Sequence, residues 1–236
     1  MKRKLPHFAV SLMCMDLAHP ADQIDQLNKH AYSFHYDLMD GHFAPNLALS
    51  PDWIRAITPY SKVRNDIHLM SDEPERWLEP LAQAGADIIS PHAEAIGNNA
   101  FRIMNQIKEL GCKTGLVINP MTPFDQVKLL LDRVDLLTFM TVDTGFAGQP
   151  FINEVLGKIH QAYDFRNKEG LQYEIQIDGH CCPSTFARIA NSGADTLILG
   201  NAGLFSLDHD LDRAWQLMEE SYQAAVESAE SAGINE

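Results

Sequence analysis

The segment Pro74–Ser90, PERWLEPLAQAGADIIS, contains the pattern on which the fold prediction depends. A helix-length amphipathic stretch begins at a proline and ends at Gly85, and the apolar run Asp87–Ser90 follows it. The junction Ala-Gly-Ala-Asp at Ala84–Asp87 is nearly repeated as Ser-Gly-Ala-Asp at Ser192–Asp195. Two similar junctions between a helix and a strand are what repeated βα units would produce.

The same alternation of amphipathic and apolar segments continues along the chain. Eight strand-like runs, separated by helix-length segments, predict the α/β class and a single (β/α)8 TIM barrel domain over residues 1–236. An open, doubly wound sheet is the alternative, although no G-x-G-x-x-G sequence opens the first helix. The predicted strands are His7–Leu12, Ser33–Leu38, Val63–Leu69, Asp87–Ser90, Cys112–Ile118, Leu136–Met140, Tyr173–Ile177 and Thr196–Leu199.

Prolines near the first turns and glycines after the last turns support the predicted helices. Residues 227–236 are small and polar, and we expect this C-terminal tail to fray. The predicted helices are Pro20–His30, Pro51–Thr58, Pro74–Ala84, Asn98–Leu110, Phe124–Asp132, Ile152–Lys168, Ser184–Ser192 and Asp210–Ser228.

The composition is that of a globular protein with an acidic balance of charge. The chain has 18 Lys and Arg against 32 Asp and Glu, which gives a net charge of −14 at pH 7 with histidine neutral. Nucleic acids and anionic membranes are bound through excess basic residues, so we expect neither as a partner. No apolar run reaches the roughly 18 residues of a membrane span. Because basic residues are few, an anionic ligand would need backbone N–H groups or a metal rather than a basic patch.

The cysteine pattern indicates free thiols. Cys14, Cys112, Cys181 and Cys182 show no C-x-x-C spacing, so zinc fingers and a disulfide framework are weak interpretations. Free thiols are typical of a reducing compartment, and we expect a cytoplasmic protein. The basic start Met1–Lys4 precedes a short apolar stretch without a small-residue cleavage site. It is interpreted as a basic leader before a strand rather than as a signal peptide.

Polar side chains gather at the C-terminal ends of three predicted strands, where the active site of a (β/α)8 barrel lies. His35 and Asp37 share one strand face, because side chains alternate along a strand. His68 lies near the end of the third run, and Asp178 follows the seventh. Any one of these residues alone is more often structural, but four that converge favour a divalent transition-metal site. Asp40, which precedes a glycine, is interpreted as a turn residue.

Two other groups near strand ends have ordinary explanations. His92 and Glu94 could form a pair behind a metal ligand, but loop polarity is the favoured interpretation. Methionine near a strand end usually fills the core, and a polarizable floor under a reacting carbon is the less common alternative. The methionines concerned are Met13, Met39, Met70 and Met140.

Glycines follow the last three predicted strands. Because glycine has no Cβ, it lets backbone N–H groups approach an anion. In barrels of this class a phosphate is commonly held by these late loops and a short extra helix. Each glycine is a weak sign by itself, but three loops in succession predict a phosphate site, to which His180 could contribute. The loop residues are Gly145, Gly148, Gly179, Gly200 and Asn201.

At these residues the chain resembles the ribulose-phosphate 3-epimerase family. The matching segments are spread along nearly the whole chain, and the motif at His35–Asn46 is highly specific. The segments are Ser11–Met13, His35–Asn46, His68–Met70, Met140–Asp143, Gly145–Gln149 and Asp178–Gly179.

The resemblance implies a (β/α)8 barrel that epimerises a ketose phosphate at C3 in a homo-oligomer. It also implies one divalent metal ion per subunit, with Zn, Co, Mn and Fe as candidates. Asp37 and Asp178 would move the proton on opposite faces of the carbon, through a metal-stabilised enediolate. The implied metal ligands are His35, Asp37, His68 and Asp178. The implied substrate contacts are Ser11, Met39, Met70 and Met140, with the phosphate facing Gly148, Gly179, Gly200 and Asn201. The pattern of the late loops adds Gly145 and His180 to the candidate substrate contacts.

Three segments are most similar to the branch of the family that acts on D-allulose 6-phosphate, namely Ser11–Leu17, Phe146–Ile152 and Glu169–Ile175. The expected reaction is therefore the conversion of D-allulose 6-phosphate to D-fructose 6-phosphate. One alternative is the conversion of D-ribulose 5-phosphate to D-xylulose 5-phosphate. The other is a sugar-phosphate-binding barrel without activity.

The chain also departs from the family pattern at a few positions. Ala9 and Val10 stand where the family has Ser-Pro, and Thr144 replaces a usual proline. His180 stands in place of a glycine, and Asn201 in place of a serine. All but the first departure lie around the expected phosphate, so they bear on substrate choice more than on the chemistry.

Overall fold

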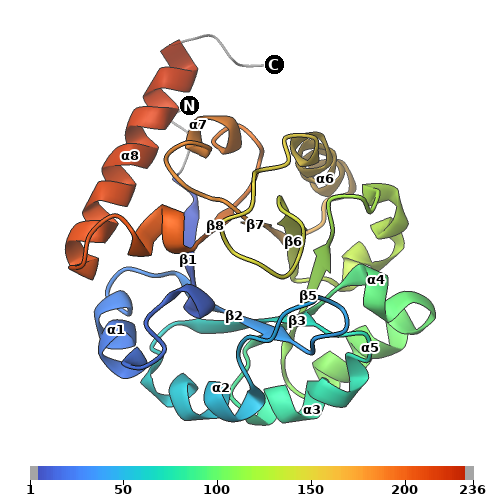
Figure 1. Ribbon diagram of the computed structural model, residues 1–236. Coiled ribbons are helices and arrows are strands. Elements are labelled where there is room, and N and C mark those ends of the chain that lie inside the picture. Colours follow the sequence, from blue (N-terminus) through green and yellow to red (C-terminus); the bar gives the residue numbers. More distant parts are fainter. Residues whose placement is uncertain (1–4, 232–236) are drawn as a thin grey trace.

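In a computed structural model that describes residues 5–231, eight parallel strands close into a barrel in chain order (Figure 1). The last strand pairs with the first, and helices surround the barrel on its outside (Figure 1). The predicted (β/α)8 TIM barrel is confirmed. The strands are β1 His7–Ser11, β2 Ser33–Met39, β3 Arg64–Met70, β4 Ile88–Pro91, β5 Lys113–Ile118, β6 Leu136–Met140, β7 Glu174–Asp178 and β8 Thr196–Leu199.

Local signals in the sequence explain where several helices begin and end. At the start of α2, Pro51 occupies the first turn and the Ser50 hydroxyl accepts a hydrogen bond from the Trp53 N–H. At the end of α6, Gly170 adopts the left-handed conformation with φ of 67°. The helices are α1 Pro20–Leu27, α2 Pro51–Ile57, α3 Glu75–Gln83, α4 Ala93–Ile96, α5 Ala100–Glu109, α6 Val155–Glu169, α7 Phe186–Ile189 and α8 Leu211–Ser231.

The segment between β5 and β6 is not the predicted helix. Residues 124–132 form two consecutive 3-10 helices, Phe124–Gln126 and Lys128–Arg133. The backbone closes on i→i+3 hydrogen bonds, from the Val127 N–H to the Phe124 carbonyl and from the Leu130 N–H to the Val127 carbonyl. The buried side chains Phe124, Val127, Leu131 and Val134 keep the spacing of an amphipathic α-helix, so the apolar pattern by itself predicts the wrong helix type.

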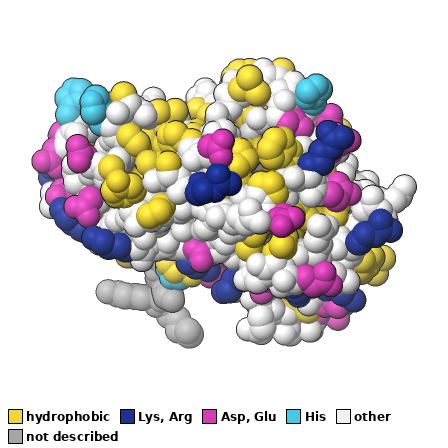
Figure 2. Space-filling view, turned by 90° about the horizontal axis from the view of Figure 1, so that it is seen from below, with side chains coloured by type: hydrophobic (Ala, Val, Ile, Leu, Met, Phe, Trp, Pro, Cys, Tyr) yellow, Lys and Arg dark blue, Asp and Glu magenta, His cyan; other side chains and the backbone are white. Residues whose placement is uncertain are grey.

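The ends of the chain are only partly described. The helix α8 continues to Ser231, which lies inside the segment for which the sequence predicts fraying. Residues 232–236 and the basic leader 1–4 lie outside the described residues. Between residues 5 and 231, no helix has the length and apolar character needed to cross a bilayer. On the side of the barrel seen in Figure 2, basic and acidic side chains are interspersed rather than separated by sign.

The alternation of side chains along β2 separates the hydrophobic core from the interior of the barrel. Phe34, Tyr36 and Leu38 belong to the large apolar core between strands and helices. The intervening residues His35 and Asp37 therefore point to the inside of the barrel. Both are buried.

The barrel interior carries a polar layer below the C-terminal ends of the strands. Asp66 on β3 accepts hydrogen bonds from the Ser90 hydroxyl at 2.7 Å and from Nε2 of Gln176 at 2.9 Å. Gly115 on β5 makes room for this layer, because a Cβ at that position would lie 1.9 Å from Ser90 Oγ. The buried carboxylate is therefore held from several strands at once.

Candidate metal centre and active site

Four side chains from three strands converge at the C-terminal end of the barrel. They offer ligand atoms that all lie within 4.8 Å of one another. Nε2 of His35 lies 3.5 Å from Oδ1 of Asp37 and 3.4 Å from Oδ2 of Asp178. Nδ1 of His68 lies 3.3 Å from each of the same two oxygens. The four residues that the sequence predicts as metal ligands are thus brought together.

The register of the parallel strands produces this convergence. Asp37 on β2 is paired with His68 on β3, so their side chains stand side by side. His35 lies two residues before Asp37 on the same face, one step deeper in the barrel. Asp178 ends β7 and reaches the group from across the barrel.

The residues fit a divalent cation. Burial by itself would raise the pKa of Asp37, but the neighbouring His35 and His68 outweigh it and hold that pKa below its usual range. Burial would lower the pKa of His35, yet the surrounding carboxylates raise it well above its ordinary value. Asp37 is buried and Asp178 is largely buried, so a positive charge between the two carboxylates would stabilise both. Two nitrogen and two oxygen ligands are the donor set that transition metals such as Zn²⁺ accept.

The orientation of His35 is fixed from below. Its Nδ1–H donates to Oδ2 of Asp66 at 2.9 Å, which leaves Nε2 directed at the four-residue cluster. Burial would raise the pKa of Asp66, but the hydrogen bonds from His35, Ser90 and Gln176 lower it. Asp66 was not predicted as a site residue, because nothing in its local sequence distinguishes it from a structural residue.

His68 has a different support. Its Nε2 lies 2.8 Å from Nε2 of His92, and Nδ1 of His92 lies 3.1 Å from Oε2 of Glu94. The expectation that His92 and Glu94 contribute only loop polarity is wrong, because His92 is fully buried against His68. Burial is the main reason that the pKa of His92 falls to about 4. Hydrogen bonds from His92 and Thr122 outweigh burial and lower the pKa of Glu94 to about 2.

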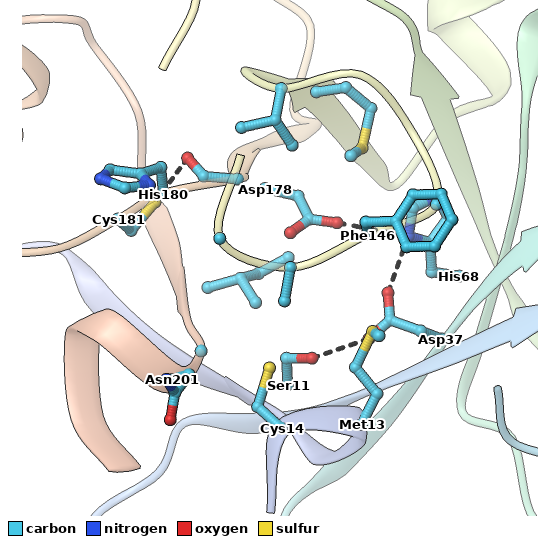
Figure 3. A pocket seen from close by; sticks show the side chains of 18 of the residues that line it. Ser11, Met13, Cys14, Asp37, His68, Phe146, Asp178, His180, Cys181 and Asn201 are labelled. Carbon is cyan, nitrogen blue, oxygen red and sulfur yellow. Dashed lines mark hydrogen bonds and ion pairs between the residues drawn. The ribbon is translucent and has the colours of Figure 1, made fainter. Parts of the chain in front are cut away.

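A cavity of about 200 Å³ opens above the cluster (Figure 3). Asp37, His68 and Asp178 line it, whereas His35 lies beneath them. The Ser11 hydroxyl donates to Oδ2 of Asp37 at 2.7 Å. All the residues predicted to contact substrate line this cavity: Ser11, Met39, Met70, Met140, Gly145, Gly148, Gly179, His180, Gly200 and Asn201.

Several lining residues were not predicted. Cys14 reaches the cavity because a 3-10 turn follows β1 directly, and burial raises the pKa of its thiol to about 11. Phe146 also lines the cavity, from the loop after β6, and its side chain is exposed. The aromatic residue between the two loop glycines was the available signal for this contact.

The cavity has two ends of different construction (Figure 3). We call the cluster of His35, Asp37, His68 and Asp178 the metal end. Across the cavity from His68, Asn201 and His180 stand at the rim (Figure 3). We call this region, together with the glycines of the late loops, the anion end. It consists of Gly145, Gly148, Gly179, His180, Gly200 and Asn201.

The backbone of the anion end is unusual. Gly179 has φ of 119°, and a Cβ there would lie 2.8 Å from Cγ2 of Val142. His180 has φ of 51°, the one positive φ among the described non-glycine residues. Its Nδ1 is buried and finds no hydrogen-bond partner within residues 5–231. A non-glycine residue held in this conformation at a cavity rim is a mark of a functional position.

Comparison with known proteins gives a consistent result. Residues 7–205 match the sequence profile described as the Ribulose-phosphate 3 epimerase family. The ribulose-phosphate 3-epimerase of Synechocystis sp. is 38% identical over 196 residues, which cover 82% of this chain and 85% of that protein. The ribulose-phosphate 3-epimerase of Bacillus subtilis is also 38% identical over 196 residues, covering 82% of this chain and 90% of that protein.

Solved structures are similar in fold at low sequence identity. KGPDC from Streptococcus mutans superposes with a TM-score of 0.66 at 11% identity, covering 94% of this chain and 100% of that one. N-(5'-phosphoribosyl)anthranilate isomerase from Pyrococcus furiosus has a TM-score of 0.61 at 10% identity, covering 93% of this chain and 100% of that one. At such identities the likeness concerns the barrel alone.

Proposed function

This chain belongs to the ribulose-phosphate 3-epimerase family and is an isomerase, and on that premise we propose that it converts D-ribulose 5-phosphate to D-xylulose 5-phosphate. The observation that carries the proposal is the pair Asp37 and Asp178, whose carboxylates both face one cavity and both contact His68. Epimerisation needs a proton taken from one face of a carbon and returned to the other. Two carboxylates in one cavity can divide these tasks.

The preference for the pentose phosphate rests on the relatives. The proteins with 38% identity are named ribulose-phosphate 3-epimerases, and they cover most of this chain. The names of these relatives favour D-ribulose 5-phosphate, the alternative substrate inferred from the sequence, over the expected D-allulose 6-phosphate. The hexose phosphate remains the second candidate because of the segments Ser11–Leu17, Phe146–Ile152 and Glu169–Ile175.

In the proposed reaction, one carboxylate is ionised and the other is protonated at the start. The ionised carboxylate removes the C3 proton, and the C3–H electron pair moves to form the C2–C3 double bond of an enediolate while the C2 carbonyl oxygen becomes negative. The protonated carboxylic acid then gives its proton to C3 from the opposite face, as the electron pair of the C2–C3 double bond forms the new C3–H bond and the C2 oxygen re-forms the carbonyl. Ser11 donates to Asp37, which fixes the carboxylate that it contacts. Water is kept from the reacting carbon by Met39, Met70 and Met140 around the cavity.

A divalent cation belongs to this proposal. His35, Asp37, His68 and Asp178 would hold it, with Zn, Co, Mn and Fe as the candidates. When bound, it would supply positive charge next to the substrate oxygen on which negative charge develops. The substrate phosphate would lie at the anion end, where glycine backbone rather than a basic patch faces the cavity.

The test is deuterium uptake at C3 in D₂O, followed by proton NMR. D-ribulose 5-phosphate and D-allulose 6-phosphate would each be supplied with and without a chelator. We expect chelator-sensitive exchange that is faster with the pentose phosphate. Faster exchange with the hexose phosphate would reverse the substrate assignment, and no exchange with either, in protein loaded with metal, would contradict epimerase activity.

Two further properties stay predictions. A homo-oligomer is expected, and light scattering coupled to size-exclusion chromatography would measure its size. A cytoplasmic location is expected from the thiols, and the four cysteines are unpaired in the structure. Fractionation of cells that express the protein would test the location.

A further inference from the structure

Two imidazole nitrogens face each other behind the metal end. Nε2 of His68 and Nε2 of His92 are 2.8 Å apart, so one of them must carry the proton and the other must accept it. Neither ring is exposed to solvent. Proximity does not decide the direction of this hydrogen bond, and the partner on the far side of His92 must decide it.

That partner is Glu94. Its Oε2 lies 3.1 Å from Nδ1 of His92, and an ionised carboxylate can only accept. The proton of His92 therefore sits on Nδ1, and its Nε2 carries the lone pair. In the neutral ring that a metal ligand requires, His68 must then donate from Nε2, which leaves Nδ1 of His68 with its lone pair beside Asp37 and Asp178.

We propose that His92 and Glu94 are positioning residues that select the tautomer of His68, so that its Nδ1 lone pair is presented to the cation at the metal end. The inference rests on the proposed metal site and adds to it two residues that touch neither the cavity nor the reacting atoms. Hydrogen bonds behind a metal-bound histidine fix its ring and its tautomer.

Glu94, the last member of the hydrogen-bonded series His68–His92–Glu94, is anchored. Oε1 of Glu94 accepts from the Asn119 N–H at 2.9 Å and from the Thr122 hydroxyl. Nζ of Lys158 on α6 holds the same loop by donating to the carbonyl oxygens of Asn119 and Pro120, each at 2.8 Å. Since both carboxylate oxygens of Glu94 are engaged by donors, the carboxylate cannot rotate without losing a partner.

The arrangement parallels that of the other histidine ligand. Asp66 accepts directly from Nδ1 of His35 and leaves Nε2 for the cluster. Glu94 does the same for His68 through one intervening ring. Phe43 packs on that ring, with centroids 4.5 Å apart, and keeps it in place. Each of the two histidines is therefore supported by a carboxylate, His35 directly by Asp66 and His68 by Glu94 through the ring of His92.

Two substitutions interrupt the hydrogen-bonded series His68–His92–Glu94 at different points. His92→Phe keeps an aromatic ring against Phe43 and removes the acceptor for His68. Glu94→Gln places an amide N–H₂ either against the Nδ1–H of His92 or against the donors Asn119 and Thr122. In the first case His92 must change its tautomer, and in the second the anchor is lost.

The matched control lies away from the cavity. Nε2 of His30 pairs with Asp212 at 2.6 Å, and its ring stacks on Trp215. His30→Phe therefore removes a histidine–carboxylate bond of the same kind. Zn²⁺ affinity would be measured for each variant by competition with a chromophoric chelator. We expect His92→Phe and Glu94→Gln to bind Zn²⁺ about 10- to 100-fold more weakly than the parent, and His30→Phe to bind it equally well.

Equal Zn²⁺ affinity in the parent and in the folded His92→Phe protein would overturn the inference, because it would leave only a packing role. A parent protein that does not bind Zn²⁺ would overturn the metal site itself, so the two failures are distinguishable. Long-range ¹H–¹⁵N correlation spectra of the Zn²⁺-loaded parent protein report the tautomer directly. We expect His92 to be protonated on Nδ1 and not on Nε2, and the reverse pattern would overturn the inference without any variant.

Discussion

The metal end and the anion end of the cavity are built from different parts of the chain. At the metal end, largely buried side chains from β2, β3 and β7 contact one another. Behind them, His35 is hydrogen-bonded to Asp66, and His68 is linked through His92 to Glu94. At the anion end, loops present backbone with positive φ, as at Gly179 and His180. The first is specified by which side chains stand on a strand face, and the second by the conformation that each residue can adopt.

This difference separates chemistry from substrate choice. Every ligand position at the metal end carries the side chain that the family resemblance implies. The departures His180 and Asn201 lie at the anion end. A change in loop backbone can alter which phosphate fits while the paired strands that hold the metal end stay intact. Substitutions at the two ends should therefore fail in different measurements.

The largest effect is expected at the metal end. In the proposed reaction, Asp37→Asn and Asp178→Asn each remove a group that would carry the proton, and we expect kcat to fall by about 10²- to 10⁴-fold. Asp40→Asn is the control, because Asp40 follows β2 and its Oδ1 accepts the His42 N–H in a turn. Steady-state kinetics would give kcat for all three variants, and the control should keep the kcat of the parent protein. Near-normal turnover in either of the first two variants would contradict the two-carboxylate mechanism.

At the anion end, the expected failure is one of stability and binding. Gly179→Ala would place a Cβ 2.8 Å from Val142 Cγ2 in a backbone conformation with φ of 119°. We expect a loss of about 2 to 4 kcal/mol in the free energy of unfolding, measured with urea, from strain and overpacking together.

Gly148→Ala is the matched comparison for this prediction. Gly148 has φ of 81°, but a Cβ there meets no atom within 4 Å. Its cost should be the backbone strain alone, about 1 kcal/mol. Equal losses in the two variants would show that the close approach at Gly179 contributes nothing.

The pH dependence of metal binding sharpens the comparison. Burial lowers the pKa of His35 and His68, but the carboxylates around them outweigh it and raise the pKa of both rings above the ordinary value of histidine. A cation must displace the protons that these rings hold. Zn²⁺ affinity should therefore rise as the pH increases from 6 to 8, with protons released on binding.

Isothermal titration calorimetry in buffers of different ionisation enthalpy would count the protons. Binding without proton release at pH 7 would contradict the assignment of raised pKa values. The anion end presents mostly glycine backbone to the cavity, and backbone N–H groups do not titrate over this range. Once the substrate phosphate is fully ionised, above its second pKa of about 6, its affinity should therefore depend less on pH than the affinity for Zn²⁺.

The smallest effect is expected from His180→Gly. Relief of the left-handed conformation gains about 1 kcal/mol, and the added freedom of glycine in the unfolded chain costs a similar amount. Unfolding by urea should therefore change little. Because His180 is only half-buried, its loss should raise KM by less than about fivefold with kcat unchanged. A fall in kcat with KM unchanged would place His180 with the reacting atoms instead.

Most of the fold could be predicted from the sequence, because apolar runs and their flanking residues specify strands locally. The runs Ser33–Leu38 and Leu136–Met140 correspond closely to β2 and β6. The α-helix predicted at 124–132 is instead a pair of 3-10 helices. Its buried residues Phe124, Val127 and Leu131 have helical spacing, so the hydrophobic pattern did not distinguish the two types of helix.

The site was predictable where function depends on residue type at a strand end, as for His35 and Asp178. It was not predictable where function depends on contacts between strands. Asp66 and His92 act on residues of other strands, and a single sequence does not give those distances. The left-handed conformation of His180 was not predicted, although the glycine that the family has at this position was a sign of it.

The two carboxylates that face the cavity have a consequence for metabolism. Asp37 and Asp178 both contact His68 at 3.3 Å, so neither is singled out by that contact as donor or acceptor. In the proposed reaction, whichever is ionised begins one direction of conversion and the other begins the reverse. Like any catalyst, it would leave the equilibrium between the two epimers unchanged, so the ratio of the epimers around it would set the net flux.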